Sequence, residues 1–156
     1  MNIIDQSGAL AIATRLQRLS ERIRKEGLLI YKEYGIEFEP KWFPVIYALH
    51  AKPFLSVMEI ANEIGYTHPS TITLLKELEK KKLVRSKKDK IDERKRLIEL
   101  TPQGIALVDK IKPVWKLITR AANELIKTPN NLMHAINEVE EQLRKKSFFE
   151  RAKKFM

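Results

Sequence analysis

Apolar residues recur at helical spacing in the first part of the chain. Four of them are separated by four, three and four positions, which places them on one stripe of a helix: Ile12, Leu16, Leu19 and Ile23. The pattern predicts a long helix from about Gln6 to Tyr34, with Gly35 at its end. A narrow stripe on about eight turns of helix favours a partner helix, and packing within its own domain is the alternative.

Two shorter helices are predicted next, each with its own start signal. Pro40 and Pro44 fit the first turns of a helix that runs to His50, where a missing amide donor costs least. Ser56 and Glu59 form a capping-box pattern, in which each side chain can satisfy a backbone amide of the other. A helix is therefore expected to begin at Ser56.

The helix that begins at Ser56 is expected to end at Gly65, and Thr67 is expected to cap another helix that runs to about Lys82. Leucines at 74, 75 and 78 give that last helix an apolar face. The opposite face carries donors suited to phosphates and base edges: His68, Ser70, Thr73, Lys76 and Lys80. An ordinary amphipathic surface helix is the alternative interpretation.

Two strands with partly alternating residues are predicted at Leu83–Ser86 and Arg96–Leu100. From Arg85 to Arg96 the chain has seven basic and three acidic residues, and a hairpin this basic repels itself unless an anion binds. The candidate contacts of this hairpin are Lys87, Lys88, Lys90, Asp92, Arg94, Lys95 and Arg96. The hairpin therefore predicts a site for a polyanion.

Asp92 and Arg94 are two residues apart and are expected to share one face of an extended strand. The carboxylate would orient the guanidinium group and leave its other donors free to enter a minor groove, where negative potential attracts arginine. A solvated ion pair that contributes little is the alternative.

Thr101 and Pro102 predict the start of a helix that runs to about Lys127, with a kink at Pro113. Thr128 and Pro129 repeat the start signal for a last helix. Apolar residues of this last helix and the aromatic chain end are expected to contact the first helix of a second subunit: Leu132, Ile136, Val139, Leu143, Phe148, Phe149 and Phe155. A role for this basic, Phe-rich end at a membrane surface is the alternative.

Thirty Lys and Arg against twenty Asp and Glu give a net charge of +10, which favours polyanionic partners, although charge that only aids solubility is the alternative. The chain has no cysteine, which excludes disulfides and thiolate metal sites. The three histidines lack metal-ligand spacing, and no catalytic motif occurs, so neither an enzyme nor a metal or other cofactor is expected. Without a membrane-spanning segment or a leader pattern, the protein is expected to be cytoplasmic.

The span from Ile60 to Gly104 carries the patterns I-A-x-x-I-G, H-P-S, L-x-x-L-E-K-K-x-L-V, D-x-R and L-T-x-x-G. These resemble the DNA-binding core of the multiple-antibiotic-resistance regulator (MarR) family. The resemblance implies a mainly α fold with a small β-hairpin wing, and a homodimeric regulator of transcription that binds double-stranded DNA. It matches Arg94 to the wing arginine of the family and Asp92 to its supporting acid.

Three positions depart from the pattern of the family. Lys82 replaces the glycine that is common before the wing, so the helix is expected to end differently. Thr71 stands where an apolar residue is usual, and Ile72 stands where a hydroxyl is frequent. The base contacts are therefore open among Ser70, Ile72 and Thr73, and Ile72 is suited to contact a thymine methyl group.

The predicted organisation is a dimerisation helix in residues 1–35, a winged helix-turn-helix in 36–101 and further dimerisation helices in 102–156, all in one compact subunit. Regulators that resemble this family often respond to a small ligand, and Trp42, Tyr47 and Trp115 are candidates to line its pocket. A core role for these aromatic residues is the alternative. The competing function is a basic interaction module that docks a protein or an RNA through the winged helix.

Overall fold

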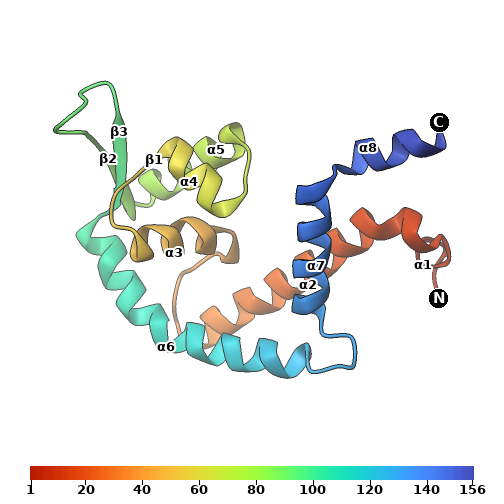
Figure 1. Ribbon diagram of the computed structural model, residues 1–156. Coiled ribbons are helices and arrows are strands. Elements are labelled where there is room, and N and C mark those ends of the chain that lie inside the picture. Colours follow the sequence, from red (N-terminus) through yellow and green to blue (C-terminus); the bar gives the residue numbers. More distant parts are fainter. The chain divides into compact units, whose positions relative to one another are not determined.

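The computed structural model describes residues 1–156, of which 70% are helical, with one small antiparallel sheet (Figure 1). The predicted mainly α fold with a β-hairpin wing is confirmed. Contacts within the chain divide it into two units, residues 1–114 and 115–156, and each is described by itself. No helix is both long enough and apolar enough to span a bilayer.

Helices, with short 3-10 helices written η, make up most of the first unit. They are α1 (Ile3–Gln6), η1 (Gly8–Ala11), α2 (Ile12–Glu33), η2 (Pro40–Trp42), α3 (Phe43–Ala51), α4 (Val57–Ile64) and α5 (His68–Lys80). The strands are β1 (Leu55–Ser56), β2 (Val84–Lys88) and β3 (Arg96–Leu100). Helix α6 (Pro102–Leu125) begins in this unit, and α7 (Leu132–Lys145), α8 (Phe148–Ala152) and η3 (Lys153–Phe155) belong to the second.

The long N-terminal helix begins later than the sequence predicts. Gly8 has a φ of +61°, a left-handed backbone that interrupts the helix, so the start expected near Gln6 is wrong and α2 starts at Ile12. Its predicted end is confirmed, because Gly35 has a φ of +65° and its amide donates to the carbonyl of Lys32 at 2.9 Å.

The helix-turn-helix follows its predicted caps closely. The capping box is present at the start of α4: Ser56 accepts from the amide of Glu59, and the Glu59 carboxylate accepts from the amide of Ser56. Gly65 ends α4 at a φ of +71°, and Thr67 caps α5 by accepting from the amide of Ser70 at 3.3 Å. Only two residues, Tyr66 and Thr67, therefore separate Gly65 from the start of α5 at His68.

The wing is part of a three-stranded sheet in the order β1-β3-β2 (Figure 1). Its first strand runs to Lys88, two residues beyond the predicted end, and β3 has the predicted bounds. The short strand β1 was not predicted, because Leu55 and Ser56 give too short a run to show alternation. Leu55 lies opposite Ile98 of β3, so the sheet fixes the start of α4 at the base of the wing.

Lys82 shows how α5 ends without a glycine. Its φ is +59°, its amide donates to Glu79, and the amide of Leu83 donates back to Leu78 at 3.0 Å. These two bonds are the ones that a C-terminal glycine usually closes, so the different helix end expected from the missing glycine is wrong. A side chain in this conformation costs about 1–2 kcal/mol.

The start of α6 is pinned to the turn between α5 and the wing. The hydroxyl of Thr101 donates to the carbonyl of Lys82 at 2.6 Å, and the amide of Thr101 donates to the carbonyl of Leu83 at 3.0 Å. Thr101 also caps α6 by accepting from the amide of Gly104 at 3.0 Å. A Cβ atom at Gly104 would lie 2.2 Å from the carbonyl oxygen of Leu83, so only glycine fits there.

The core of the first unit forms around α3. Four apolar side chains of η2 and α3 are at most 2% exposed: Trp42, Val45, Ile46 and Leu49. The indole of Trp42 donates to the Glu77 carboxylate at 2.9 Å, which ties η2 to α5. Hydrogen bonds from Lys41 and then from Trp42 hold the pKa of Glu77 below its ordinary value.

The second unit begins its last long helix later than predicted. Asn131 caps α7 by accepting from the amides of Met133 and His134, so the start signal read at Thr128 and Pro129 is wrong. A proline after a threonine also suits a connecting loop, and residues 127–131 form such a loop with a bend at 128–130. Pro113 lies within α6, which is one continuous helix from Pro102 to Leu125.

The close approach at Gly104 gives a stability prediction. Gly104→Ala should lower the free energy of unfolding by about 2 kcal/mol, because the added methyl group meets a backbone oxygen that three elements hold in place. Gly27→Ala is the matched control, since its methyl group meets only a carbon of Pro40 at 3.8 Å. In urea unfolding, Gly27→Ala should be neutral or stabilising by about 0.5–1 kcal/mol. Equal midpoints for both variants would contradict the close approach.

Candidate nucleic-acid interface

The outward face of α5 carries the polar side chains that the sequence placed there. His68, Ser70, Thr73, Lys76 and Lys80 are all exposed, whereas Leu74, Leu75 and Leu78 are buried. Ile72 is half-buried at the side of this face. The helix therefore turns a mixed polar and apolar surface to solvent, with its lysines in the second half.

Thr71 takes the core position where an apolar residue is usual. It is 0% exposed, and its hydroxyl donates to the carbonyl of Thr67 at 2.9 Å. Because the hydroxyl is satisfied within the helix, the side chain can be buried like a valine. The exchanged order of residues 71 and 72 therefore leaves the core of the winged helix intact.

Local hydrogen bonds restrict what the other hydroxyl groups of α5 offer. Thr73 donates its hydroxyl to the carbonyl of Pro69 at 3.0 Å, and Ser70 accepts from the hydroxyl of Thr67 at 2.9 Å. Thr73 thus presents an acceptor and a methyl group, and Ser70 keeps its own proton to donate. Sequence reasoning treated both side chains as free donors, because intrahelical bonds of this kind depend on the rotamer.

Asp92 and Arg94 do not form the predicted pair. The Asp92 carboxylate accepts from the backbone amide of Arg94 at 3.1 Å and makes no ion pair with its guanidinium group. The prediction that they share a strand face is wrong because both lie in the turn between β2 and β3. Asp92 therefore shapes the backbone that presents Arg94, as aspartates commonly do in tight turns.

The wing tip keeps its basic side chains unpaired. Asp89 accepts from the amide of Ile91 at 2.9 Å, so it too supports a turn. None of the ion pairs within the chain involves the basic residues from 88 to 96, and all five are exposed: Lys88, Lys90, Arg94, Lys95 and Arg96. Because the aspartates bind backbone amides, they form no ion pairs with these side chains, and the five cations of the tip outnumber its three acidic residues.

Lys87 differs from its neighbours. Its ammonium group lies 3.3 Å from Glu99 and 4.0 Å from the centre of the Phe54 ring, so it is already held at the base of the wing. Arg85 binds the other oxygen of Glu99 at 3.0 Å. The role of Glu99 was missed in the sequence, although the register that places it opposite Arg85 would have revealed it.

Glu99 is ionised by its neighbours. Burial raises the pKa of a carboxyl group, but hydrogen bonds from Arg85 and Lys87 outweigh it here and hold the pKa of Glu99 below its ordinary value. The carboxylate therefore stays charged at neutral pH and joins both strands of the wing.

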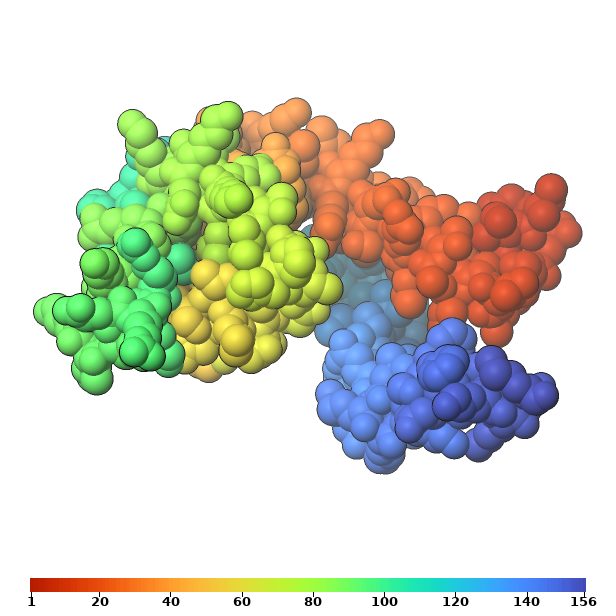
Figure 2. Space-filling view, turned by 90° about the horizontal axis from the view of Figure 1, so that it is seen from above, coloured from red at the N-terminus to blue at the C-terminus, as the bar shows by residue number.

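Helix α5 and the wing form one continuous surface. Figure 2 looks down on this face, where the yellow-green surface of α5 adjoins the green surface of the wing and no other part of the first unit lies over them. The lysines of α5 and the unpaired basic residues of the wing tip are all exposed. The charge and the two projecting elements of this surface are those of a polyanion interface.

A hollow of about 620 Å³ lies beside the end of α5. It is lined by Gly35, Ile36, Glu37, Trp42, Lys81, Leu83, Gln103, Ala106, Leu107 and Lys110. Of the three predicted ligand residues, Trp42 lines this hollow, Tyr47 does not, and Trp115 belongs to the second unit. Trp42 is also a core residue, with its indole hydrogen bonded to Glu77.

Comparison with protein families matches residues 34–103 to the MarR family. The winged helix of this chain is a MarR-family domain. The match covers the turn after α2, the helix-turn-helix, the wing and the pinned start of α6. Comparison with curated protein sequences finds no significant match.

Solved structures share the fold of this chain. Reduced AbfR bound to DNA has 16% identity and a TM-score of 0.69, over 93% of this chain and 98% of its own. The S. aureus MepR–DNA complex has 20% identity and a TM-score of 0.66, over 84% of this chain and 96% of the MepR chain. PcaV from Streptomyces coelicolor, in complex with its natural ligand, has 16% identity and a TM-score of 0.62, over 87% and 96%.

The lowered pKa of Glu99 gives a pH prediction for this MarR-family domain. A carboxyl group whose pKa is lower in the folded state stabilises the protein above its unfolded pKa, about 4.3, and this contribution is lost as the pH falls through the folded value. Glu99→Gln should therefore destabilise the protein by about 1 kcal/mol at pH 7. In urea unfolding, the difference in the free energy of unfolding between wild type and Glu99→Gln should shrink below pH 4.

Glu93→Gln is the control, because Glu93 is exposed at the wing tip and makes no ion pair. It should leave stability unchanged at both pH values. A Glu99→Gln deficit that is the same at pH 3 and pH 7 would contradict the role assigned to the carboxylate.

Proposed function

We propose that this chain is a sequence-specific, duplex-DNA-binding regulator of transcription that acts as a homodimer and responds to a small ligand. The observation that carries the proposal is the wing tip with its five unpaired basic side chains, which adjoins the outward face of α5 in a MarR-family domain. Two of the structures with this fold, those of AbfR and MepR, are DNA complexes. A basic helix-and-wing surface suits a duplex, which offers a groove to each element.

Within this proposal, α5 enters the major groove. Its N-terminal turns face the base edges, and Lys76 and Lys80, one turn apart, contact phosphates or bases at the groove wall. His68, Ser70, Ile72 and Thr73 are the remaining contacts proposed for this helix. The charge of the lysines supplies affinity without sequence preference.

The wing is proposed to follow the adjacent minor groove. Arg94 is exposed at its tip, and the turn that Asp92 stabilises presents it. Narrow minor grooves concentrate negative potential, which favours an unpaired guanidinium group. Lys88, Lys90, Lys95 and Arg96 are proposed to contact the flanking phosphates, and Lys87, which is bound to Glu99, contributes mainly to the base of the wing.

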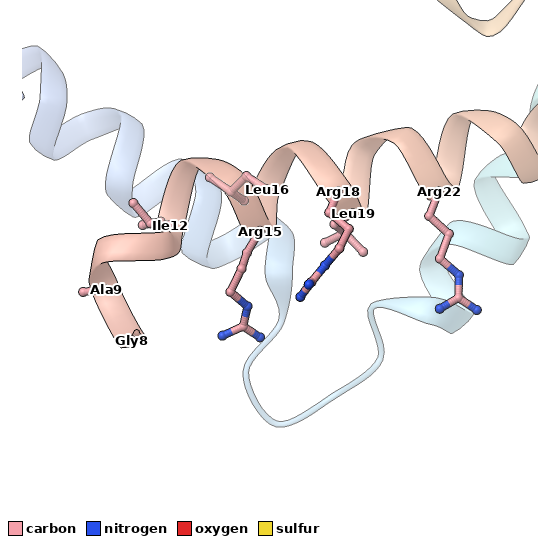
Figure 3. A pocket seen from close by; sticks show the side chains of 8 residues that line it. All are labelled: Gly8, Ala9, Ile12, Arg15, Leu16, Arg18, Leu19 and Arg22. Atoms are coloured by element: carbon pink, nitrogen blue, oxygen red, sulfur yellow. The ribbon is translucent and has the colours of Figure 1, made fainter. Parts of the chain in front are cut away.

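Exposed apolar side chains support the homodimer. On α2 the stripe remains uncovered within its unit, with Ile12, Leu16 and Leu19 exposed by 51%, 49% and 39%. Figure 3 shows Arg15, Arg18 and Arg22 pointing to one side of α2, next to this stripe. An apolar stripe with a charged border is typical of a surface that a second subunit covers.

The second unit carries the complementary apolar residues. Val139, Leu143 and Phe148 are exposed by 50%, 48% and 74%, and Leu132 and Ile136 lie on the same face of α7. We propose that these side chains and the stripe of α2 form the interface between two copies of the chain. Two recognition helices would then lie about 34 Å apart and read a pseudo-palindrome.

The hollow beside Trp42 is the proposed ligand site of the first unit. Lys81 and Leu83 at the end of α5 and Gln103 at the start of α6 line it, so a bound molecule would contact the joint that positions the recognition helix. The natural ligand bound to PcaV supports a ligand response for a protein of this fold. Such a ligand would change the affinity for DNA only if it binds one arrangement of this joint more tightly than another.

The DNA interface is tested by Arg94→Ala. Because Arg94 is unpaired and exposed, its loss should weaken binding to a duplex enriched from random DNA by about tenfold, or about 1.4 kcal/mol, and leave the unfolding midpoint unchanged. Gel-shift titration measures the change. Arg120→Ala removes the same charge from an exposed position of α6 and should bind normally. Equal affinities of both variants would contradict the wing contact.

The dimer is tested by Leu16→Glu. Sedimentation equilibrium should give wild type at twice the chain mass of 18.2 kDa, and the variant should dissociate because a buried charge is costly at an apolar interface. Thr14→Glu adds the same charge on the opposite side of α2 and should remain dimeric. A monomeric wild type at micromolar concentration would exclude the proposed assembly.

A further inference from the structure

We infer that the recognition helix α5 selects its DNA through thymine methyl groups, with Ile72 and Thr73 as the specificity-determining side chains. The inference rests on the proposed function, since it assigns the base preference of the same surface. Two observations carry it: the residue types that α5 lacks, and the hydrogen bonds that occupy its hydroxyl groups.

The first observation is the set of missing side chains. Arginine or lysine reads guanine, and asparagine or glutamine reads adenine, through paired hydrogen bonds in the major groove. Helix α5, HPSTITLLKELEK, has no arginine, asparagine or glutamine along its 13 positions, and its two lysines, Lys76 and Lys80, lie beyond the first two turns. The paired readout of guanine or adenine is therefore absent from the first two turns of this helix.

The second observation is the fixed chemistry of the hydroxyl groups. Thr71 is buried, and the hydroxyl of Thr73 donates its proton to the carbonyl of Pro69. Ser70 lies to one side and accepts from Thr67. Thr73 therefore turns its methyl group and one acceptor outward, and it cannot donate to guanine without breaking a bond within its own helix.

These constraints leave an apolar patch at the start of α5. Pro69, Ile72, Thr73 and Lys76 are spaced i, i+3, i+4 and i+7, so they are neighbours on one side of the helix. Pro69 and Thr73 are exposed and Ile72 is half-buried, and Lys76 ends the patch. This side of the helix is thus largely apolar from Pro69 to Thr73, a little more than one turn, with the Thr73 oxygen as its one acceptor.

The base edge that matches this patch is that of thymine. Its 5-methyl group is the one apolar group that an A·T pair presents in the major groove. Burial of one methyl group contributes about 0.8 kcal/mol, which corresponds to about a fourfold change in affinity. The inference therefore predicts A·T pairs, with thymine facing residues 72 and 73, at the centre of each half-site.

The experiment removes only the methyl group. Duplexes are enriched from random DNA with the full chain, and each thymine of a recovered duplex is replaced in turn by deoxyuridine, which keeps the base pair and its hydrogen-bonding groups. Fluorescence anisotropy should show an affinity loss of about fourfold at one or two positions per half-site and none at thymines outside them.

Matched variants then assign the effect to side chains. Thr73→Val keeps a methyl group and loses the hydroxyl, and it should bind the thymine duplex as wild type does. Thr73→Ser keeps the hydroxyl and loses the methyl group, and it should bind about fourfold more weakly, with no further loss on deoxyuridine. Ile72→Ala should behave like Thr73→Ser, whereas Lys76→Ala should weaken both duplexes equally.

Three results would overturn the inference. Unchanged affinity at every deoxyuridine position would show that another group, such as the His68 ring or the wing, selects the sequence. Normal binding by Thr73→Ser with weak binding by Thr73→Val would assign the readout to the hydroxyl. A random pool from which no sequence is enriched would overturn the proposed function as well, so the two failures are distinguishable.

Discussion

The carbonyl group of Leu83 is where the recognition helix, the wing and α6 meet. The last turn of α5 places this group, the amide of Thr101 donates to it at 3.0 Å, and Gly104 lets α6 pass it at a distance that no side chain permits. In the proposed function, α5 and the wing enter neighbouring grooves of a duplex, which requires a fixed spacing between them. The contacts at Leu83 fix the backbone where α5 ends and the wing begins.

Charged side chains are paired at the base of the wing and unpaired at its tip. At the base, Glu99 neutralises Arg85 and Lys87 and joins the two strands. At the tip, the aspartates bind backbone amides and leave the cations free. The net charge of +10 therefore does more than keep the chain in solution, because part of it collects where a folded turn projects from the domain. Composition alone could not distinguish these two uses of charge.

Local rules predicted most of the winged helix. Ser56, Gly65, Thr67 and Thr101 act through residues at most a few positions away, so their caps can be read from the sequence. The same rules failed at two helix starts. The left-handed backbone of Gly8 delays the start of α2, and Asn131 caps α7 where the sequence suggested Thr128.

The sequence predicted which residues belong to the site better than it predicted which groups these residues contact. The sequence identified the basic tip and the outward face of α5. It paired Asp92 with the guanidinium group of Arg94, whereas Asp92 binds the backbone amide of Arg94, and it missed the role of Glu99. Both errors come from register and turn geometry, which set side-chain directions that spacing does not show. Thr71 shows the converse, since a polar residue in the core is explained once its bond to Thr67 is known.

Affinity for a selected duplex, compared with a scrambled duplex of the same composition and with RNA of the same sequence, tests the central claim most directly. Anisotropy titrations of the full chain at two salt concentrations would supply the comparison. A specific duplex binder should prefer the selected sequence by about 10³ or more and lose affinity by about 0.9 log units per log unit of salt for each phosphate neutralised. Equal affinity for all three nucleic acids would contradict it.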